Sequence, residues 1–371
     1  MNFLVITNVE HYCFDNQIFG YAPYIREMNI WIKNVAKVTV VAPMSDKSPT
    51  EIDSIYQHAN LEFNEISAFN CLNLLATFKT IVALPKILLR IIKAMKKAEH
   101  IHLRCPGNMG LLGCIVQIFF PKKTKTAKYA GNWDLKAAKP LTYRVQQWIL
   151  NNTFLTKNMQ VLVYGEWEGS SKNIKPFFTA TYSQNEIVKI SEKNVNTALK
   201  CIFVGTLVAG KNPLYAIQLV HKLQNFGIDV SLDLYGDGVL RSALQDYIST
   251  NKLGHFIFLK GNISKENLKK YYQESHFMIL PSASEGWPKA VAEAMFWGCV
   301  PVATNVSCVS EMIGNGTRGL LLTLDLDKDF LKLKNICANN YIFNSLSSHA
   351  IAWSQQYTIE KFDTEIQRLL R

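Results

Sequence analysis

The second half of the chain alternates short apolar runs with helical segments, and this alternation limits the fold more than any other feature of the sequence. Strands are predicted at 201–205, 230–236, 256–259, 277–280 and 300–304, with helices between them. Pro213 fits the first turn of one helix and Gly227 its end, and Ser264 is placed to cap another. Repeated β-α-β units form a parallel sheet that is covered on both faces. The second half therefore predicts a doubly wound α/β domain.

The first half predicts a second domain of the same class, with weaker patterning. Strands are expected at 3–7, 38–42, 100–104 and 128–130, and helices at about 20–33 and 85–98. A chain of 371 residues has room for two such domains. We place the boundary in the polar stretch 191–198, which gives an N-terminal domain at 1–195, a C-terminal domain at 196–355 and a final helical segment at 356–371.

The charge of the chain is basic and uneven. Hydrophobic residues make up 48% of the chain and charged residues 19%, which excludes a disordered polymer. The net charge is +11, and residues 1–195 supply +9 of it. We therefore expect an anionic partner on the N-terminal half, such as a lipid head group, a membrane surface or a phosphorylated acceptor. Nucleic acid is not expected, because the sequence has no zinc-finger spacing, RNP pattern or basic zipper.

The cysteines and the first residues bear on the compartment. The chain has eight cysteines and no CxxC pair, and several cysteines lie in apolar runs, which predicts buried free thiols in a reducing compartment. The first residues read as a strand rather than a signal peptide. The longest apolar stretch, 111–121, is about half of the roughly 20 residues that a spanning helix needs. We expect a cytoplasmic protein that is soluble or attached peripherally to the inner face of a membrane.

Two glutamates eight positions apart, Glu285 and Glu293, lie on a predicted strand–loop–helix turn. The first turn of a helix offers free N–H groups and a partial positive charge, which suits a diphosphate. Carboxylates beside such a site are favourable when they bind hydroxyl groups. The pair therefore predicts a ligand that carries both phosphates and hydroxyls, namely a sugar nucleotide. Taken alone, two such glutamates are better explained as an acid at a helix start and a solvated helix residue, and the neighbouring sequence is what favours the ligand site.

Five blocks of the second half, in order, are similar to the retaining glycosyltransferases of family GT4, the glycosyl transferases group 1. The blocks are FVGTLVAGKNP (203–213), LYGDGVLRSAL (234–244), IFLKGNISKENLKKYYQESHFMILPS (257–282), SEGWPKAVAEAMFWGCVPVAT (284–304) and SEMIGNGTRGLLL (310–322). The fourth block resembles the E-x7-E segment of that family. The resemblance implies the GT-B fold, in which two Rossmann-like domains face each other across a cleft. It also implies a donor in the C-terminal domain, an acceptor in the N-terminal domain and a final helix that crosses back to the N-terminal domain.

The resemblance assigns roles on the donor side. Glu293 would hold the ribose hydroxyls, and Glu285 would bind the donor sugar and stabilise the transition state. Lys211 would neutralise the leaving diphosphate, and because that charge develops during the reaction, Lys211 is a catalytic candidate. The backbone near 261–263 would contact the base. The donor-binding candidates besides Glu293 are Gly205, Thr206, Gly236, Gly261, Asn262, Ile263, Gly286, Trp287, Pro288 and Lys289.

Two positions depart from the family pattern. Thr206 stands where the family usually has an arginine that binds the diphosphate. Either another cation substitutes, with Lys289 and Arg241 as candidates, or the affinity for the donor is lower. Pro288 stands where the family loop often reads EGFG, and it has no N–H to offer the sugar, which bears on the identity of the sugar.

No cofactor and no metal are expected. The segment 236–238 reads Gly-Asp-Gly, but Arg241 stands where a dinucleotide fingerprint has its third glycine, which excludes NAD binding. Asp325 and Asp327 match a D-x-D metal motif in letters only, because they follow an apolar run near the predicted domain edge.

Candidates on the acceptor side are less specific. Gly20 is the single glycine where the family places a glycine-rich loop, and Arg26 lies in the helix that should follow. Arg104 ends a predicted strand, where a structural role is favoured over an acceptor role. Asn132 and Asp134 lie where family members place a polar residue near the reacting carbon, often a histidine. Asp134, the one acid between positions 99 and 166, is the candidate acceptor base.

The residues Lys79, Lys86, Arg90, Lys93 and Lys97 follow one another at intervals of 7, 4, 3 and 4 positions, the spacing of one face of a helix. Because Pro85 is expected to begin the helix, Lys79 would lie before it, and the other four would form a basic stripe. They fit a contact with an anionic membrane and fit equally well a solvated outer helix.

These features predict a retaining glycosyltransferase that moves a sugar from a nucleotide-sugar donor to a hydroxyl of a glycan or lipid-linked acceptor, in the synthesis of a cell-surface polysaccharide or glycoconjugate. Two alternatives stay open. One is another GT-B enzyme, such as a sugar-nucleotide epimerase. The other is a catalytically silent scaffold in a glycan assembly complex, which Thr206 and the missing histidine favour.

Overall fold

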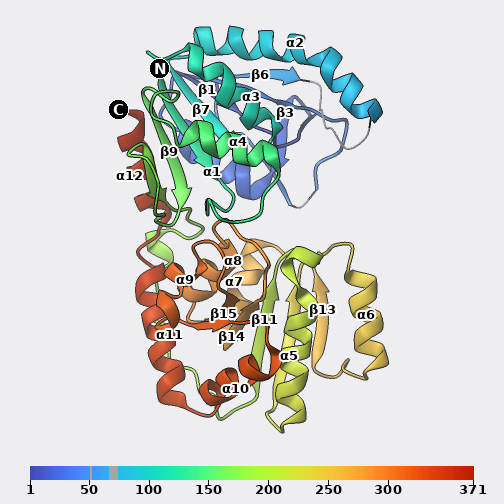
Figure 1. Ribbon diagram of the computed structural model, residues 1–371. Helices are drawn as coiled ribbons and strands as arrows, with labels where there is room; N and C mark the ends of the chain where they lie inside the picture. The colour runs from blue at the N-terminus through green and yellow to red at the C-terminus, as the bar shows by residue number, and fades with distance from the viewer. Residues whose placement is uncertain (51, 67–73) are drawn as a thin grey trace. The chain divides into compact units, whose positions relative to one another are not determined.

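The computed structural model describes residues 1–50, 52–66 and 74–371, and in the helix that begins at Leu74 it describes side chains from residue 83. The chain divides into two compact units (Figure 1). Unit 1 is Met1–Phe178 together with Asp363–Arg371, and unit 2 is Thr179–Phe362. Each unit is an α/β fold built on its own parallel sheet, as the sequence predicted.

The main sheet of unit 1 has seven parallel strands in the order β10-β9-β8-β7-β1-β4-β6. They are β1 (Asn2–Ile6), β4 (Lys37–Pro43), β6 (Leu61–Ile66), β7 (His100–Cys105), β8 (Thr124–Tyr129), β9 (Met159–Tyr164) and β10 (Ile174–Phe177). The order runs outward in both directions from β1. The carboxyl ends of β1 and β7 are therefore the point of the sheet where doubly wound folds place ligands.

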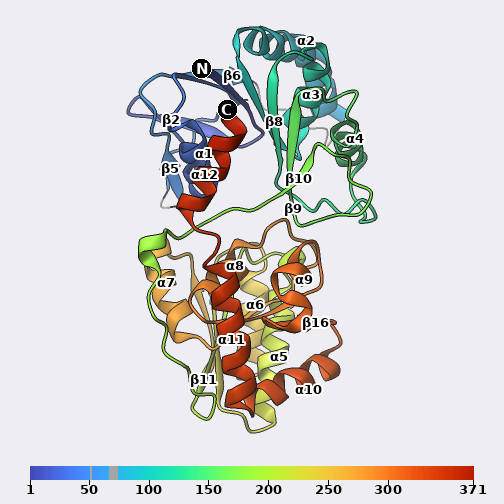
Figure 2. The same ribbon diagram turned by 90° about the vertical axis from the view of Figure 1, so that its left-hand side faces the viewer.

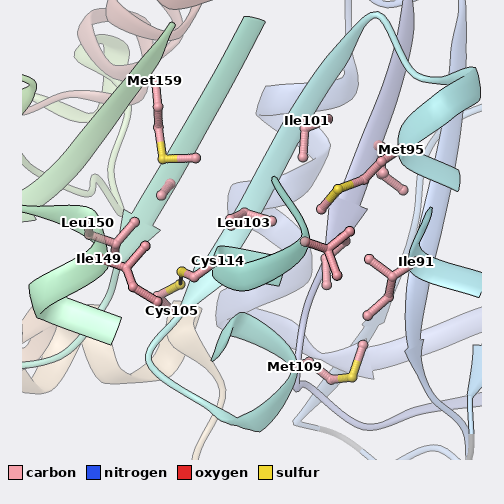
Figure 3. Packing of buried hydrophobic residues seen from close by; sticks show 14 of the residues in the cluster. Ile91, Met95, Ile101, Leu103, Cys105, Met109, Cys114, Ile149, Leu150 and Met159 are labelled. Carbon is pink, nitrogen blue, oxygen red and sulfur yellow. Dashed lines mark hydrogen bonds between the residues drawn. The ribbon is translucent and has the colours of Figure 1, made fainter. Parts of the chain in front are cut away.

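Helices cover both faces of this sheet. Three helices, α2 (Leu74–Lys97), α3 (Asn108–Val116) and α4 (Leu141–Leu150), lie on one face, and α1 (Ala22–Ile32) lies on the other (Figures 1 and 2). The core under the first group is shown in Figure 3, where Ile91 and Met95 of α2, Cys114 of α3 and Leu150 of α4 meet the strands. The buried residues of α2 recur every three or four positions, which is the periodicity of a helix face.

Two expectations for unit 1 are wrong. The helix predicted to begin at Pro85 begins at Leu74 and contains Pro85, because one proline removes one N–H donor while Ile87 and Ile91 still pack on the sheet. Lys79 falls in this helix, and its side chain lies outside the described residues, as does Cys71. Gly20 does not open a helix. It lies in β3, and α1 begins at Ala22.

Gly20 belongs to a small antiparallel sheet that the sequence analysis missed. This sheet contains β2 (His11–Phe14), β3 (Gln17–Tyr21) and β5 (Asp53–Ile55). Asp15 and Asn16 form the two-residue turn between β2 and β3, with φ of 48° and 58°, as such hairpins require. A hairpin therefore takes the place of the expected glycine-rich loop after β1.

Unit 2 has six parallel strands in the order β13-β12-β11-β14-β15-β16. They are β11 (Leu199–Val204), β12 (Val230–Tyr235), β13 (Ile257–Gly261), β14 (Phe277–Leu280), β15 (Val300–Thr304) and β16 (Leu320–Leu322). The helices are α5 (Pro213–Asn225), α6 (Arg241–Thr250), α7 (Lys265–Glu274), α8 (Lys289–Phe296), α9 (Val309–Met312), α10 (Leu326–Cys337) and α11 (Asn340–Ser354). This is again the doubly wound order, with its reversal between β11 and β14.

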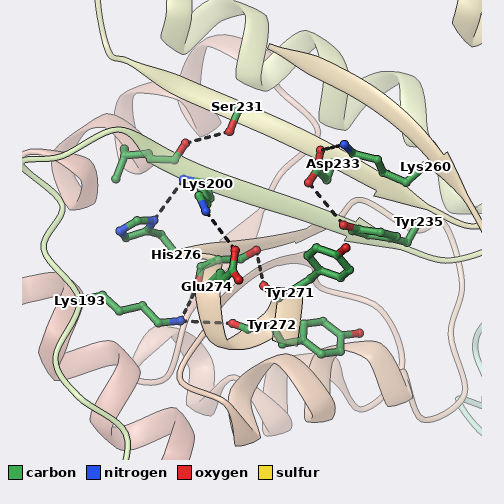
Figure 4. A network of polar contacts seen from close by, with 12 residues as sticks. Lys193, Lys200, Ser231, Asp233, Tyr235, Lys260, Tyr271, Tyr272, Glu274 and His276 are labelled. Atoms are coloured by element: carbon green, nitrogen blue, oxygen red, sulfur yellow. Dashed lines mark hydrogen bonds and ion pairs between the residues drawn. The ribbon is translucent and has the colours of Figure 1, made fainter. Parts of the chain in front are cut away.

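The boundary between the units lies at Phe178, earlier in the chain than the polar stretch 191–198. The residues after it are fixed to unit 2 by individual side chains rather than by a regular apolar pattern. The ring of Tyr182 lies 4.9 Å from that of Phe296, and Lys193 Nζ donates to the carbonyl oxygens of Tyr272 and Ser275 (Figure 4). Sequence periodicity could not reveal these contacts.

The last helix, α12 (Ile359–Leu370), contributes residues to both units. Glu360 accepts a hydrogen bond from the backbone N–H of Gln184 in unit 2, at 2.8 Å. Asp363 forms an ion pair with Lys33 of unit 1, at 3.3 Å. The chain therefore passes from unit 2 to unit 1 within this helix.

Within the described residues, no helix is long and apolar enough to cross a bilayer, and no cluster of His, Cys, Asp or Glu is arranged to hold a metal ion. Asp325 of the D-x-D sequence caps α10, where its carboxylate accepts from the N–H of Lys328 at 3.1 Å. The cysteines that the structure describes are free thiols, and all but Cys13 are buried.

Candidate functional site

The switch point of unit 2 brings together the two residues predicted to be catalytic. Lys211 ends the short 3-10 turn after β11, and Glu285 lies in the loop after β14. Lys211 Nζ lies 2.5 Å from Glu285 Oε1, and the Glu285 carboxylate is buried. A backbone hydrogen bond from Ala283 N to Gly210 O, at 2.9 Å, joins the same two loops. A cation and a carboxylate are thus paired at the edge of the sheet where ligands bind.

The loop between β11 and α5 is shaped to present Lys211. Asn212 has a left-handed conformation, with φ of 50°, and Pro213 occupies the first turn of α5, so the helix begins directly after the lysine. A Cβ atom built on Gly205 would lie 3.9 Å from Lys211 Cδ. The lysine side chain therefore passes over Gly205 on its way to Glu285.

Close backbone contacts hold the neighbouring loops against this one. Gly236, which follows β12, has φ of 131°, and a Cβ atom there would lie 2.0 Å from Gly205 O. Gly205 N donates to Tyr235 O at 3.0 Å, and Gly236 N donates to Gly261 O at 2.8 Å. Asn262 and Ile263, the other residues predicted to meet the base, follow Gly261 directly. The carboxyl ends of β11, β12 and β13 consequently form one continuous edge.

Side chains from later segments of unit 2 hold the loop from Glu285 to α8 in place. The carbonyl of Gly286 accepts from Cys308 Sγ at 3.1 Å and from Ser307 Oγ at 3.3 Å. Burial raises the pKa of Cys308 to about 12, so the thiol keeps the proton that it donates. The Trp287 ring stacks on Trp353, with centroids 5.9 Å apart. Pro288 is the N-cap of α8, where its missing N–H costs no helical hydrogen bond.

Glu293 lies on the second turn of α8 in a different environment from Glu285. Its carboxylate accepts from Thr181 Oγ1 at 2.8 Å and from Tyr272 Oη at 3.4 Å. Burial raises the pKa of Glu293, against the lowering effects of the Thr181 hydrogen bond and the charges of Lys289 and Lys265. A carboxylate with about four acceptor positions can bind further hydroxyl groups. The two predicted glutamates therefore differ in chemistry: Glu285 meets a cation and Glu293 meets hydroxyl groups.

Thr181 and Tyr272 are partners that the sequence analysis missed. Tyr272 could have been found, because it lies four positions after Leu268 on the buried face of α7. No sequence signal marks Thr181, which reaches Glu293 from the segment before β11.

The cations that could compensate for Thr206 lie at different places. Thr206 itself is exposed. Arg241 opens α6, where Nη2 donates to Leu259 O at 3.4 Å and Nη1 lies 3.8 Å from the place of a Cβ atom on Gly261. Lys289 opens α8 and acts electrostatically on Glu293. Arg241 is thus near the predicted base region, and Lys289 is near the predicted ribose site.

The switch point of unit 1 contains a buried ion pair. Arg104, at the end of β7, lies 2.6 Å from Glu27 of α1, and the two side chains are 14% and 2% exposed. The Arg104 guanidinium also lies over the ring of Tyr24, 5.5 Å from its centroid. Tyr56 Oη donates a hydrogen bond to Tyr24 Oη at 3.4 Å and shares another with His11 Nε2 at 3.0 Å. Arg104 was predicted, whereas Glu27 was missed although it is an acid within the apolar stripe of α1.

The other acceptor-side candidates lie apart from this pair. Arg26 is on the exposed face of α1. Asn132 and Asp134 follow β8, and their side chains close turns: Asn132 Oδ1 accepts from the N–H of Asp134, and Asp134 Oδ1 accepts from the N–H of Lys136, both at 2.9 Å. Both contacts are local turn contacts, and each carboxylate or amide oxygen keeps further acceptor capacity.

Lys86, Arg90, Lys93 and Lys97, the basic residues of α2 with the spacing of one helix face, are all exposed, as that spacing predicted. Arg90, Lys93 and Lys97 line a cavity of about 590 Å³ between α2 and strands β4 and β6, together with Glu62 and Glu65. The Arg90 guanidinium donates to the carbonyl oxygen of Glu65. Part of the predicted stripe therefore faces acidic residues of the same unit.

Comparison with known proteins finds a family that matches most of unit 2. The family described as glycosyl transferases group 1 matches residues 184–334. An uncharacterized glycosyltransferase of Methanocaldococcus jannaschii is 26% identical over 178 residues, 48% of each chain. The alpha-D-kanosaminyltransferase of Streptomyces kanamyceticus is 27% identical over 121 residues, 33% of this chain and 31% of that one. The chain thus spans about half, or less, of the length of these relatives.

Solved structures match over the whole chain. HepE of Anabaena, in complex with UDP and glucose, superposes with a TM-score of 0.71 at 15% identity and covers 100% of this chain and 99% of that one. Sucrose-phosphate synthase of Thermosynechococcus elongatus superposes with a TM-score of 0.71 at 16% identity, covering 100% and 98%. At such identities the likeness establishes the fold alone, and the sequence matches concern mainly residues 184–334. The chain has the GT-B fold, and its residues 184–334 match the group 1 glycosyltransferases, the family that its five ordered blocks resemble.

Proposed function

We propose that this protein is a retaining glycosyltransferase that moves a sugar from a nucleoside diphosphate sugar to a hydroxyl of a glycan or lipid-linked acceptor. The observation that carries the proposal is the ion pair of Lys211 and Glu285, 2.5 Å apart at the switch point of unit 2. A sugar-nucleotide donor has a diphosphate that needs a cation and a sugar that needs a hydrogen-bond acceptor. This pair offers both groups at one place.

The donor chemistry follows from the charges. Lys211 attracts the diphosphate, and it stabilises the leaving group most as the bond to the sugar breaks, because the negative charge grows there. Glu285 then accepts a hydrogen bond from a hydroxyl of the donor sugar. Glu293 accepts hydrogen bonds from the ribose hydroxyls, in the way that its carboxylate already accepts from the hydroxyls of Thr181 and Tyr272. Lysine supplies the positive charge in this scheme, so we propose transfer without a metal ion. HepE binds UDP and glucose, which makes UDP-sugars the first donors to test.

We propose that unit 1 binds the acceptor, at the carboxyl ends of β1 and β7 where Arg104 and Glu27 lie. A lipid-linked acceptor would put the protein at the cytoplasmic face of a membrane, in the assembly of a surface polysaccharide or glycoconjugate.

The test is a screen of nucleotide sugars that follows the release of nucleoside diphosphate, with Lys211→Met and Glu285→Gln as variants. Loss of one transition-state contact typically lowers kcat about 10²- to 10³-fold. The matched control is the exposed pair of Lys200 and Glu274, 3.1 Å apart, in the variants Lys200→Met and Glu274→Gln, which should keep full activity. Added chelator should leave the rate unchanged.

Two results would overturn the proposal. Epimerised nucleotide sugar, formed when the protein is incubated with donor alone, would identify an epimerase. Glycan output that is unaffected by either site variant would identify the silent scaffold that Thr206 favours.

A further inference from the structure

The basic excess of the chain is concentrated in one stretch of unit 1. Residues 74–157, which contain α2, α3 and α4, include 15 Lys and Arg against 2 Asp and Glu, a net charge of +13. The chain as a whole carries +11, so the rest of it is slightly acidic. The three helices contain no acidic residue at all. Of the basic residues, Arg104, Lys125 and Lys128 lie in strands, and the two lysines are fully buried.

Helix α4 carries large apolar side chains on its exposed face as well as on its buried face. Ile149 and Leu150 are buried against the sheet. Leu141, Val145 and Trp148 follow one another at helical spacing on the other side, and they are 73%, 36% and 64% exposed. A helix on the surface of a soluble protein normally carries polar residues on its outer face. The outer face of α4 instead presents a row of large apolar side chains.

Helix α3 lies beside α4 on the same face of the sheet (Figures 1 and 2) and extends this feature. It contains no charged residue. Ile115 is exposed near its end, and Phe119, in the 3-10 turn that follows, is 77% exposed. Phe154, just after α4, is 75% exposed. We call the residues Ile115, Phe119, Leu141, Val145, Trp148 and Phe154 the apolar patch.

Basic side chains accompany the apolar patch. Arg144 lies between Leu141 and Val145 on α4 and is exposed. Lys122 follows the 3-10 turn, and Lys157 Nζ lies over the ring of Phe154, 5.0 Å from its centroid. Apolar residues that are exposed as a group, rather than singly, mark a surface that binds a partner. Because α3 and α4 contain no acidic residue, the basic side chains beside the apolar patch favour a partner that is anionic.

We propose that the outer face of α3 and α4 binds the surface of an anionic lipid bilayer. The apolar patch enters the boundary between head groups and acyl chains, where tryptophan is favoured, and the basic residues hold the phosphate groups of the lipids. This places the membrane contact on α3 and α4 rather than on the row of basic residues of α2, because Arg90, Lys93 and Lys97 line a cavity with Glu62 and Glu65. The inference concerns binding alone and does not depend on the proposed reaction.

The test is co-sedimentation of the full chain with vesicles. We expect binding to vesicles of equal parts phosphatidylcholine and phosphatidylglycerol, weakened by salt, and little binding to phosphatidylcholine alone. The variant Leu141→Ser/Val145→Ser/Trp148→Ser should lose at least tenfold in binding. Arg144→Gln and Lys157→Gln should each lose about fivefold, the effect of one basic residue near a charged membrane.

Matched controls come from exposed apolar residues of unit 2. Val239→Ser and Tyr341→Ser change side chains that are 86% and 84% exposed, and both variants should bind vesicles like the wild type. Thermal unfolding of every variant checks that the fold is kept, since none of these side chains is in a core.

Either of two outcomes overturns the inference. One is that the triple variant binds anionic vesicles as tightly as the wild type. The other is that the wild type ignores both kinds of vesicle and forms a dimer that the triple variant does not form, which would make the apolar patch an interface between copies of the chain. Nucleotide-sugar turnover, measured without vesicles, tests the proposed function separately.

Discussion

Three glycines of unit 2 allow the cost of one close contact to be isolated. Gly236 has φ of 131°, and a Cβ atom there would lie 2.0 Å from Gly205 O. Gly227 also has a positive φ, of 95°, but a Cβ atom would meet nothing within 4 Å. Gly254 has neither constraint. Alanine at Gly254 therefore adds no cost, alanine at Gly227 adds backbone strain alone, and alanine at Gly236 adds backbone strain and a steric clash.

The expected costs can be ranked from the geometry. Gly254→Ala should change the free energy of unfolding little, or raise it by about 0.4–1 kcal/mol through the loss of chain entropy in the unfolded state. Gly227→Ala should lower it by about 1–2 kcal/mol, the cost of an alanine in a left-handed conformation. Gly236→Ala bears that cost and also displaces the Gly205 carbonyl, and overpacking of this kind adds about 1–3 kcal/mol.

Urea unfolding, followed by far-ultraviolet circular dichroism, measures the free energy of unfolding of the three variants. Nucleotide-sugar turnover measures the effect of each substitution on the site. Because Gly205 opens the loop that carries Lys211, Gly236→Ala should reduce turnover much more than Gly227→Ala. Equal destabilisation by Gly236→Ala and Gly227→Ala would show that the contact with Gly205 is not tight, and the account of this loop would be wrong.

The remaining predictions concern buried groups. Glu27→Ala should lower the free energy of unfolding by about 3–5 kcal/mol, because it leaves Arg104 buried without its ion-pair partner. In contrast, Glu365→Ala, which breaks an exposed pair with Arg368, should stay within about 0.5 kcal/mol, and equal losses in urea melts would refute the role of burial. Burial lowers the pKa of His100 to about 4 and also lowers that of His102. Below about pH 6.5 the unfolded state therefore binds protons at these histidines that the folded state does not bind. The free energy of unfolding has its full value above about pH 6.5 and falls toward pH 4, by roughly 3 kcal/mol for His100. A urea midpoint that stays constant over this range would contradict the prediction. Trp287→Ala should loosen the Glu285 loop and lower turnover with little change in the unfolding midpoint, since its ring stacks on Trp353 from a loop.

How well the sequence predicted the fold depended on where each strand lies. The predicted strands 277–280 and 300–304 agree with β14 and β15, because inner strands of a parallel sheet are buried on both faces and read as continuous apolar runs. Strand β6, with the sequence LEFNEI, was missed. It lies at the edge of its sheet, where half-buried positions accept acidic and polar residues. The residues Asp15 and Asn16, both of which tolerate a positive φ, are a sequence signal for the hairpin between β2 and β3.

The candidate site likewise contains residues that could be predicted from the sequence and residues that could not. Lys211 and Glu285 were predicted from motifs, and the parallel pairing of β11 and β14 brings the two loops together. Thr181 could not be predicted as a partner of Glu293, since the contact spans 112 positions and arises from how the segment after Phe178 lies on unit 2. Arg104 was predicted without Glu27 for a similar reason, because 77 positions separate them.

Helix α12 has a consequence for exchanging parts between relatives. Unit 2 is a continuous stretch of chain, but unit 1 is not, so a graft of unit 2 needs two junctions and the second falls inside a helix. Phe362 and Ile366, four positions apart, are both buried, one counted in each unit. Each residue of an α-helix advances about 100° around the axis. One residue gained or lost at that junction would therefore turn Ile366 away from its core. A chimaera must keep the number of residues in α12 unchanged as well as take the whole of unit 2.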